Sequence, residues 1–223
     1  MIDTSNPPIL ASAGDIDSKV KRVDLDRWLS SRYAPAAYRR DLMALYAFNH
    51  ELERALTVSE PTLARIRLQW WRDALEEMLG GQPVRRHDVA LVLAAVVMRR
   101  QGVAERMLQL IEDYEEAADA GLAAPTAKTG GQLAEAAGRV LADGSLSDDE
   151  TTLLRRAGGA YSAAKAGLVD AVNFAELKGL RVRAETMPAV AHAILAKRYL
   201  ENKTIGNLTR RRLVFATILN GRF

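Results

Sequence analysis

Apolar residues recur at intervals of three and four in the segment 38–56, which is the spacing of one face of an α-helix. The polar residues Arg39, Arg40, Glu51 and Arg54 lie largely off that face. We therefore predict an amphipathic helix whose buried face is formed by Leu42, Leu45, Phe48, Leu52 and Leu56.

A second helix is predicted over 59–79, after a short break at 57–59. Ser59 is the expected N-cap, because its hydroxyl can accept a hydrogen bond from a free backbone N–H of the first turn. Pro61 suits that first turn, because it has no N–H that would need an acceptor. Two apolar stripes lie side by side on this helix, so we expect it to be covered on more than one side. The stripes are Leu63, Ile66 and Trp70, and Leu68, Trp71, Leu75 and Leu79.

The rest of the chain has the same helical periodicity, with no convincing strand alternation or internal repeat. Ser147 and Glu150 have the spacing of a capping box, which predicts a helix start at Asp148. We predict an all-α fold, with a single helical domain over 15–223 that follows a flexible tail over 1–14. The further predicted helices cover 16–32, 89–99, 104–120, 126–141, 148–172, 187–200 and 208–219.

Composition limits the protein class. The 223 residues are 48% hydrophobic and 26% charged, which is typical of a globular chain. There is no cysteine, which excludes disulfides and thiolate metal sites, and the net charge of +3 is too small to indicate a nucleic-acid partner. The opening residues have the features of neither a signal nor a transit peptide, so we expect a cytoplasmic bacterial protein, peripheral to a membrane at most.

Two runs carry a family resemblance: DRWLSSRYAPAAYRRDLMALYAFNHELERA and SEPTLARIRLQWWRDAL. They resemble the squalene/phytoene synthase family, and within it the divergent bacterial branch related to the phytoene-synthase-like assembly factor of respiratory complex I. The resemblance covers Asp26 to Leu79 well and is faint beyond. It implies a helical bundle of the isoprenoid synthase type, reduced at its C-terminal side.

Catalytic members of that family bind prenyl diphosphates through magnesium, held by two aspartate-rich motifs. Carboxylates at i and i+4 share one helix face, so they can hold the ion together. The resemblance places Glu53 at the first aspartate of the first motif, with Arg54 beside it and Thr57 four residues on. Glu53 is then either a vestige of the motif or an ordinary solvated helix acid.

The second motif is expected within 167–188. There Asp170 matches an aspartate, but Phe174 occupies the i+4 position and cannot ligate magnesium, and Glu176 is out of step. Asp170 is more simply a surface acid. Both halves of the metal site are degraded, so the resemblance implies neither a metal nor a cofactor.

The favoured function is therefore non-catalytic: a binding or assembly factor, with respiratory complex I as the partner that the resemblance implies. A cavity for a lipid or isoprenoid could persist, and Tyr46, His50, Arg54 and Phe174 are its candidate lining. The alternative is a magnesium-dependent prenyl diphosphate transferase of the head-to-head type. It would use Glu53, Asp170 and Glu176 as ligands.

Other chemical signals are weaker. His50 has no partner at metal-ligand spacing, which argues against zinc. The pair Trp70 and Trp71 is expected to serve packing, and Arg72 is expected to pair with Glu76 one turn on, unless it anchors a neighbouring helix. The acidic cluster over 112–119 is expected to be a solvated face.

The segment 203–223 combines Arg210, Arg211 and Arg212 with apolar residues at helical spacing. Two interpretations are open. It is a terminal helix that docks on the bundle, or, over 207–223, a basic amphipathic helix that contacts an anionic membrane.

Overall fold

The computed structural model describes residues 7–100, 102–168, 177 and 179–223, and every regular element among them is helical. The predicted all-α class is confirmed, and the one bridge between extended residues in these ranges joins Arg181 and Arg222. The α-helices are α1 (Pro7–Val23), α2 (Leu25–Ser31), α3 (Ala36–Leu56), α4 (Pro61–Leu79), α5 (Asp88–Arg99), α6 (Val103–Asp119), α7 (Ala127–Leu141), α8 (Asp148–Lys165), α10 (Ala196–Leu200) and α11 (Asn207–Asn220).

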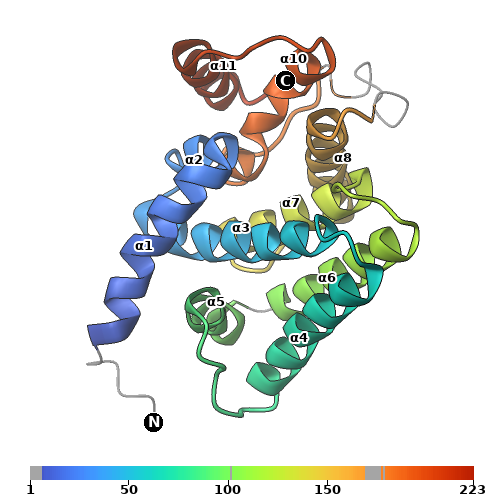
Figure 1. Ribbon diagram of the computed structural model, residues 1–223. Helices are drawn as coiled ribbons and strands as arrows, with labels where there is room; N and C mark the ends of the chain where they lie inside the picture. The colour runs from blue at the N-terminus through green and yellow to red at the C-terminus, as the bar shows by residue number, and fades with distance from the viewer. Residues whose placement is uncertain (1–6, 101, 169–176, 178) are drawn as a thin grey trace.

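Helix α3 forms the centre of the bundle, with α1, α2, α4, α5, α6 and α7 packed around it (Figure 1). Its predicted apolar stripe is fully buried, and the same hydrophobic core extends from Ile16 on α1 to Val214 on α11. Helix α11 packs beside α2, and α10 packs on α8, at the same end of the bundle (Figure 1). Two 3₁₀ turns, η2 (Met187–Ala189) and η3 (Ala191–Leu195), precede α10, where the sequence predicted one continuous helix.

The N-terminal segment differs from the prediction in two ways. Helix α1 begins at Pro7, rather than near Ile16. The predicted helix over 16–32 is also two helices, because Asp24 leaves the helical conformation and its carboxylate accepts from the backbone N–H of Arg27, which caps α2.

Helix α8 ends at Lys165, earlier than predicted, and Gly167 follows with a positive φ of 76° that a helix cannot continue through. Its start is as predicted, because Ser147 and Glu150 form the expected capping box. At α4 the N-cap is Glu60 and not Ser59, and Glu60 makes no side-chain capping bond. Pro61 is the first residue of that helix, and it has no backbone N–H that would need an acceptor.

Helices α7 and α8 pack in close contact through glycines. A Cβ built on Gly130 would lie 2.5 Å from the carbonyl oxygen of Gly158, and one built on Gly158 would lie 2.3 Å from Cβ of Ala134. The absence of a side chain at these glycines permits the close helix approach. This contact sets the position of α8, and with it the polar residues that α8 directs toward α2.

Candidate functional site: a buried polar centre

The buried face of α1 and α2 carries charged residues at core positions. Val20, Asp24, Arg27 and Ser31 follow one another at spacings of four, three and four, and all four are buried. Charged residues are almost never fully buried unless they are paired. The role of this face therefore depends on which groups pair with Asp24 and Arg27.

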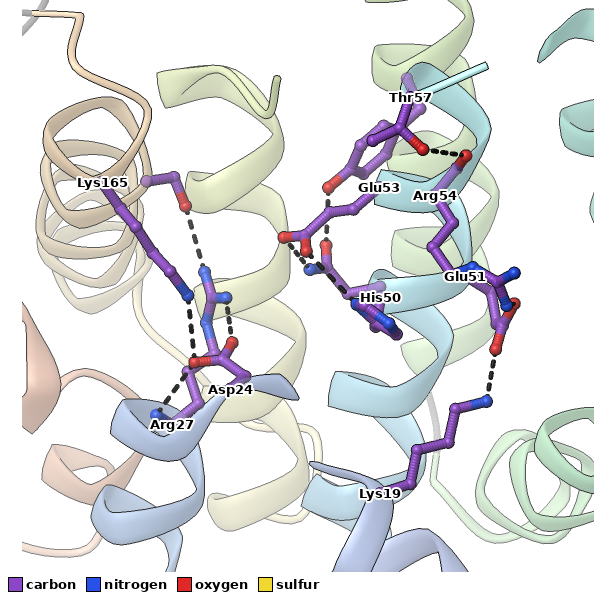
Figure 2. A network of polar contacts seen from close by, with 12 residues as sticks. Lys19, Asp24, Arg27, His50, Glu51, Glu53, Arg54, Thr57 and Lys165 are labelled. Carbon is purple, nitrogen blue, oxygen red and sulfur yellow. Dashed lines mark hydrogen bonds and ion pairs between the residues drawn. The ribbon is translucent and has the colours of Figure 1, made fainter. Parts of the chain in front are cut away.

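Asp24 and Arg27 form a buried ion pair with an Nη1–Oδ2 distance of 2.6 Å. Arg27 also donates from Nη2 to Ser162 Oγ at 3.1 Å, and Lys165 Nζ lies 3.5 Å from Asp24 Oδ1. Figure 2 shows the ammonium of Lys165 meeting the Asp24–Arg27 pair between α2 and α8. Burial alone would raise the pKa of Asp24, but Lys165 and Arg27 outweigh it and hold that pKa well below its usual range.

Glu53 lies on the side of α3 that faces this cluster, whereas Glu51 and Arg54 point the other way, toward Lys19 (Figure 2). Asn49 Nδ2 donates to Glu53 Oε1 at 2.8 Å, and the hydroxyl of Tyr114 donates to Asn49 Oδ1 at 3.0 Å. Burial would lower the pKa of Arg27, but Asp24, then Tyr161 and Glu53, raise it well above its usual range. The centre thus holds the carboxylates of Asp24 and Glu53 with the permanent cation of Arg27.

Asp26 forms a second group of buried contacts on α2. Its carboxylate accepts from the Tyr161 hydroxyl at 2.9 Å and from the Tyr199 hydroxyl, and it pairs with the guanidinium of Arg210 on α11. Burial and the adjacent Asp26 raise the pKa of Tyr199 to about 12. One carboxylate thereby links α2 to α8, α10 and α11.

Two buried groups beside these clusters have no hydrogen-bond partner among the described residues. They are the Tyr46 hydroxyl and both ring nitrogens of His192. The His192 ring packs edge-on against Tyr161, with ring centroids 4.4 Å apart. Burial, and then the neighbouring Arg27, hold the pKa of His192 well below its usual range, so the ring is neutral.

The donor set on these helices does not suit magnesium. Mg²⁺ favours several oxygen ligands, but at the first motif Glu53 is accompanied by Arg54 and by Thr57, whose hydroxyl donates to the Arg54 carbonyl at 2.9 Å. No group of three acidic or histidine side chains within the described ranges is arranged to hold a metal. The guanidinium of Arg27 would in addition repel a divalent cation.

Part of the chain matches a known family. Residues 20–128, which carry α2, α3 and Glu53, match the squalene/phytoene synthase family. Over these residues the chain is similar to that family. Its all-helical fold is the fold of the family, and the polar centre occupies the side of α3 where the first aspartate-rich motif of the family was expected.

Relatives match over a little less than half of the chain. It is 34% identical over 101 residues to NADH dehydrogenase (ubiquinone) complex I, assembly factor 6, of Rattus norvegicus, and 31% identical to the corresponding Mus musculus protein. The Homo sapiens protein is 29% identical over 101 residues. Each of these alignments covers 45% of this chain and 30% of the relative.

The predicted cavity residues on α3 differ in burial. Tyr46 is buried in the core, at 2% exposure, while His50 is half-buried, with its Nδ1 3.8 Å from Glu53 Oε2. Arg54 lines a small surface cavity of about 260 Å³ with Glu51, Arg67, Trp70, Trp71 and His87. Asp170, Phe174 and Glu176 lie outside the described residues.

Arg72 pairs across helices and not with Glu76. It donates to both carboxylate oxygens of Glu115 on α6, at 3.2 and 2.6 Å, which is the anchoring role that the sequence left open. The acidic cluster is accordingly an ion-paired face and not a freely solvated one. Asp113 is buried and pairs with Lys128 at 2.9 Å, and Asp119 pairs with Arg65 at 2.7 Å.

The first apolar stripe of α4 is not covered as predicted. Leu63 and Ile66 are 46% and 58% exposed, and Ile66 and Trp70 line an open groove of about 610 Å³ between α4 and α6. The second stripe is buried at Leu68, Trp71 and Leu75. Helix α6 covers α4 from one side only, and the apolar edge of the groove is left exposed.

Most of the polar centre was not predicted from the sequence. The segment 16–32 was predicted to be one helix on the basis of its apolar residues. The available signal was the polar pair Asp24 and Arg27 at positions where the stripe that begins at Val20 requires apolar residues. No comparable local signal identifies Tyr161, His192 or Tyr199, because only the packing of α8, η3 and α10 brings these residues to α2.

Proposed function

We propose that this chain is a non-catalytic member of the squalene/phytoene synthase family that acts as an assembly factor, with a component of respiratory complex I as its partner. The observation that carries the proposal is the buried Asp24–Arg27 pair, with the exposed Lys165 beside it, that faces Glu53. In this proposal a side-chain cation balances the acids at the centre, so that the fold needs no metal there.

The identity of the partner rests on the relatives. They are named as complex I assembly factors in rat, mouse and human. The family match over residues 20–128 includes Asp24, Arg27 and Glu53 of the polar centre and the residues that line the α4 groove. An assembly factor requires an exposed surface for its client. The groove between α4 and α6 offers exposed Ile66 beside Trp70, with charged residues around it.

Complementation tests this proposal. In a strain that lacks the gene, we expect the chain to restore assembled complex I on native gels together with NADH:quinone activity. Glu53→Gln should complement as well as the wild type, because no chemistry is assigned to that carboxylate. Normal complex I in the uncomplemented strain would refute the proposed partner.

The docking surface has its own matched pair of variants. Ile66→Asp places a charge in the α4 groove and should abolish complementation. Met98→Asp alters a similarly exposed residue on α5, at 65% exposure, and should complement fully. Circular dichroism and thermal unfolding establish that both variants are folded. If the two variants complemented equally, the α4 groove would not be the surface that binds the client.

A further inference from the structure

A basic cavity opens where α1, α2 and α11 meet, away from both the polar centre and the α4 groove. It measures about 410 Å³, and it contains the cations Lys21, Arg22 and Arg211 and no carboxylate. Within the described part of the chain, none of these three side chains lies within 4.0 Å of an acidic group. The remaining lining residues are Ser18, Leu25, Leu29 and Asn207.

The first turn of α11 adds to this positive potential. The helix begins at Asn207, on the wall of the cavity, and its N-cap Gly206 provides no side-chain capping bond. Free backbone N–H groups and the helix dipole both favour an anion at such a position. Three cations and a helix N-terminus therefore converge on one concave site.

An exposed apolar ridge borders the cavity. On α11, Leu208 and Leu219 are 71% and 67% exposed, and Phe215 is 47% exposed and packs beside Tyr33 of the segment after α2. Arg211 lies one turn from both Leu208 and Phe215, so the basic cavity and the ridge share one face of the molecule. A protein that binds only a free anion has no need of this ridge.

The orientation of α11 is fixed by its opposite side. Arg210 is paired with the buried Asp26, and Val214 and Thr217 follow at helical spacing in the core. These contacts hold α11 against α2 and turn Leu208, Arg211, Phe215 and Leu219 outward. The outward face is thus preformed, rather than assembled on binding.

From this combination we infer that the α1–α2–α11 face binds an anionic membrane surface. The phosphate of a lipid headgroup occupies the basic cavity, and Leu208, Phe215 and Leu219 enter the interface beside it. A nucleic acid offers phosphates as well, but it offers no apolar layer for three exposed side chains. No helix within the described ranges is long and apolar enough to span a bilayer, so this contact is peripheral.

The test is flotation of the full chain with phosphatidylcholine vesicles, with and without phosphatidylglycerol. We expect binding only when phosphatidylglycerol is present, and weaker binding at high salt. Lys21→Gln with Arg211→Gln should weaken binding about fivefold for each cation removed. Phe215→Ser with Leu219→Ser should weaken it at least tenfold, since interfacial binding scales with buried apolar area.

Matched controls separate this face from general surface properties. Arg156→Gln removes an exposed cation on α8, and Met98→Ser removes an exposed apolar residue on α5; both should bind vesicles like the wild type. Three results would overturn the inference. They are equal binding to neutral and anionic vesicles, equal binding by the cavity variants and the controls, and stabilisation by inorganic phosphate without any vesicle binding, which would indicate a site for a free anion.

Discussion

Two regions of this molecule are rich in charge, but burial makes them physically different. In the centre, Asp24 and Arg27 are removed from water, and their side chains are 9% and 4% exposed. On the α4–α6 face, Arg65 and Asp119 form a pair of similar length but are 66% and 57% exposed. A buried charge that loses its partner is strongly destabilising, whereas an exposed pair contributes little. Ion-pair distances alone would not distinguish the two regions.

The same comparison bears on function. The exposed pairs between α4 and α6 leave their groove open and can exchange partners with a client protein. The central pair neither lines an open groove nor is free to exchange partners, because its charges are already satisfied inside the bundle. In the region that the family resemblance marks as chemical, the buried charges are thus paired within the bundle, and the open groove lies elsewhere.

The largest expected effect comes from breaking the central pair on one side. Arg27→Met leaves the carboxylate of Asp24 buried with only Lys165 beside it, and we expect it to lower the free energy of unfolding by ~3–5 kcal/mol. Urea unfolding followed by circular dichroism measures this change. The double variant Arg27→Met, Asp24→Leu should recover a large part of the loss, because the orphaned charge is gone. A loss under ~1 kcal/mol for Arg27→Met would show that the centre is hydrated like the surface.

The pH dependence of stability sharpens the comparison further. His192 is neutral when folded, with a pKa below its unfolded value of about 6.5, so the unfolded state binds the extra proton. Stability should therefore fall as pH drops below about 6.5, by at most ~1.4 kcal/mol per pH unit from this ring. Asp24, whose folded pKa is also depressed, adds a further loss below about pH 4.

Urea unfolding at a series of pH values measures this dependence. His192→Gln should flatten the curve between about pH 6.5 and 5, because it removes the group that titrates there. His87→Gln, in a ring that packs on Trp70 and Trp71 near the surface, is the matched control and should keep the wild-type slope. If both variants kept that slope, His192 would not be the group responsible.

An intermediate effect is expected for Arg72, which is 20% exposed and bidentate to Glu115. Arg72→Gln should cost ~1 kcal/mol of unfolding free energy, because a charge-assisted pair at a partly buried site is stronger than one in open solvent. Glu76→Gln serves as the control, since Glu76 is the partner expected from sequence and not the one that Arg72 contacts. If Arg72→Gln and Glu76→Gln lowered the free energy of unfolding equally in denaturant, the result would indicate that Arg72 pairs with Glu76 within α4.

The smallest effect is expected at Arg65. Arg65→Ala should change the free energy of unfolding by no more than ~0.5 kcal/mol, because both members of its pair with Asp119 are solvated. The same denaturant series measures it. A loss as large as that of Arg72→Gln would mean that exposure does not set the contribution of these pairs.

Sequence reasoning succeeded where local patterns determine structure. The stripe of α3 and the capping box at Ser147 each follow from residues within a few positions of one another. It failed where partners are distant in sequence. Asp26 meets Tyr161 and Tyr199 across 135 and 173 residues, and the partner of Arg72 was misassigned because Glu76 is near in sequence whereas Glu115 is near in space.

The exposed stripe of α4 has the same explanation. Periodicity shows that Leu63 and Ile66 share a face, but it does not show whether another helix covers that face. For the site, the family resemblance predicted the loss of a full carboxylate set around Glu53, whereas the cation beside it could be located only from the packing of α2 against α8.

The most direct test of a metal-free centre is calorimetric titration of the purified chain with farnesyl diphosphate, with and without Mg²⁺, followed by assay of released diphosphate. With Arg27 and Lys165 already balancing the acids, we expect no magnesium-dependent binding and no diphosphate release. Magnesium-dependent binding accompanied by release would contradict a non-catalytic role and would make Glu53 the first residue to substitute.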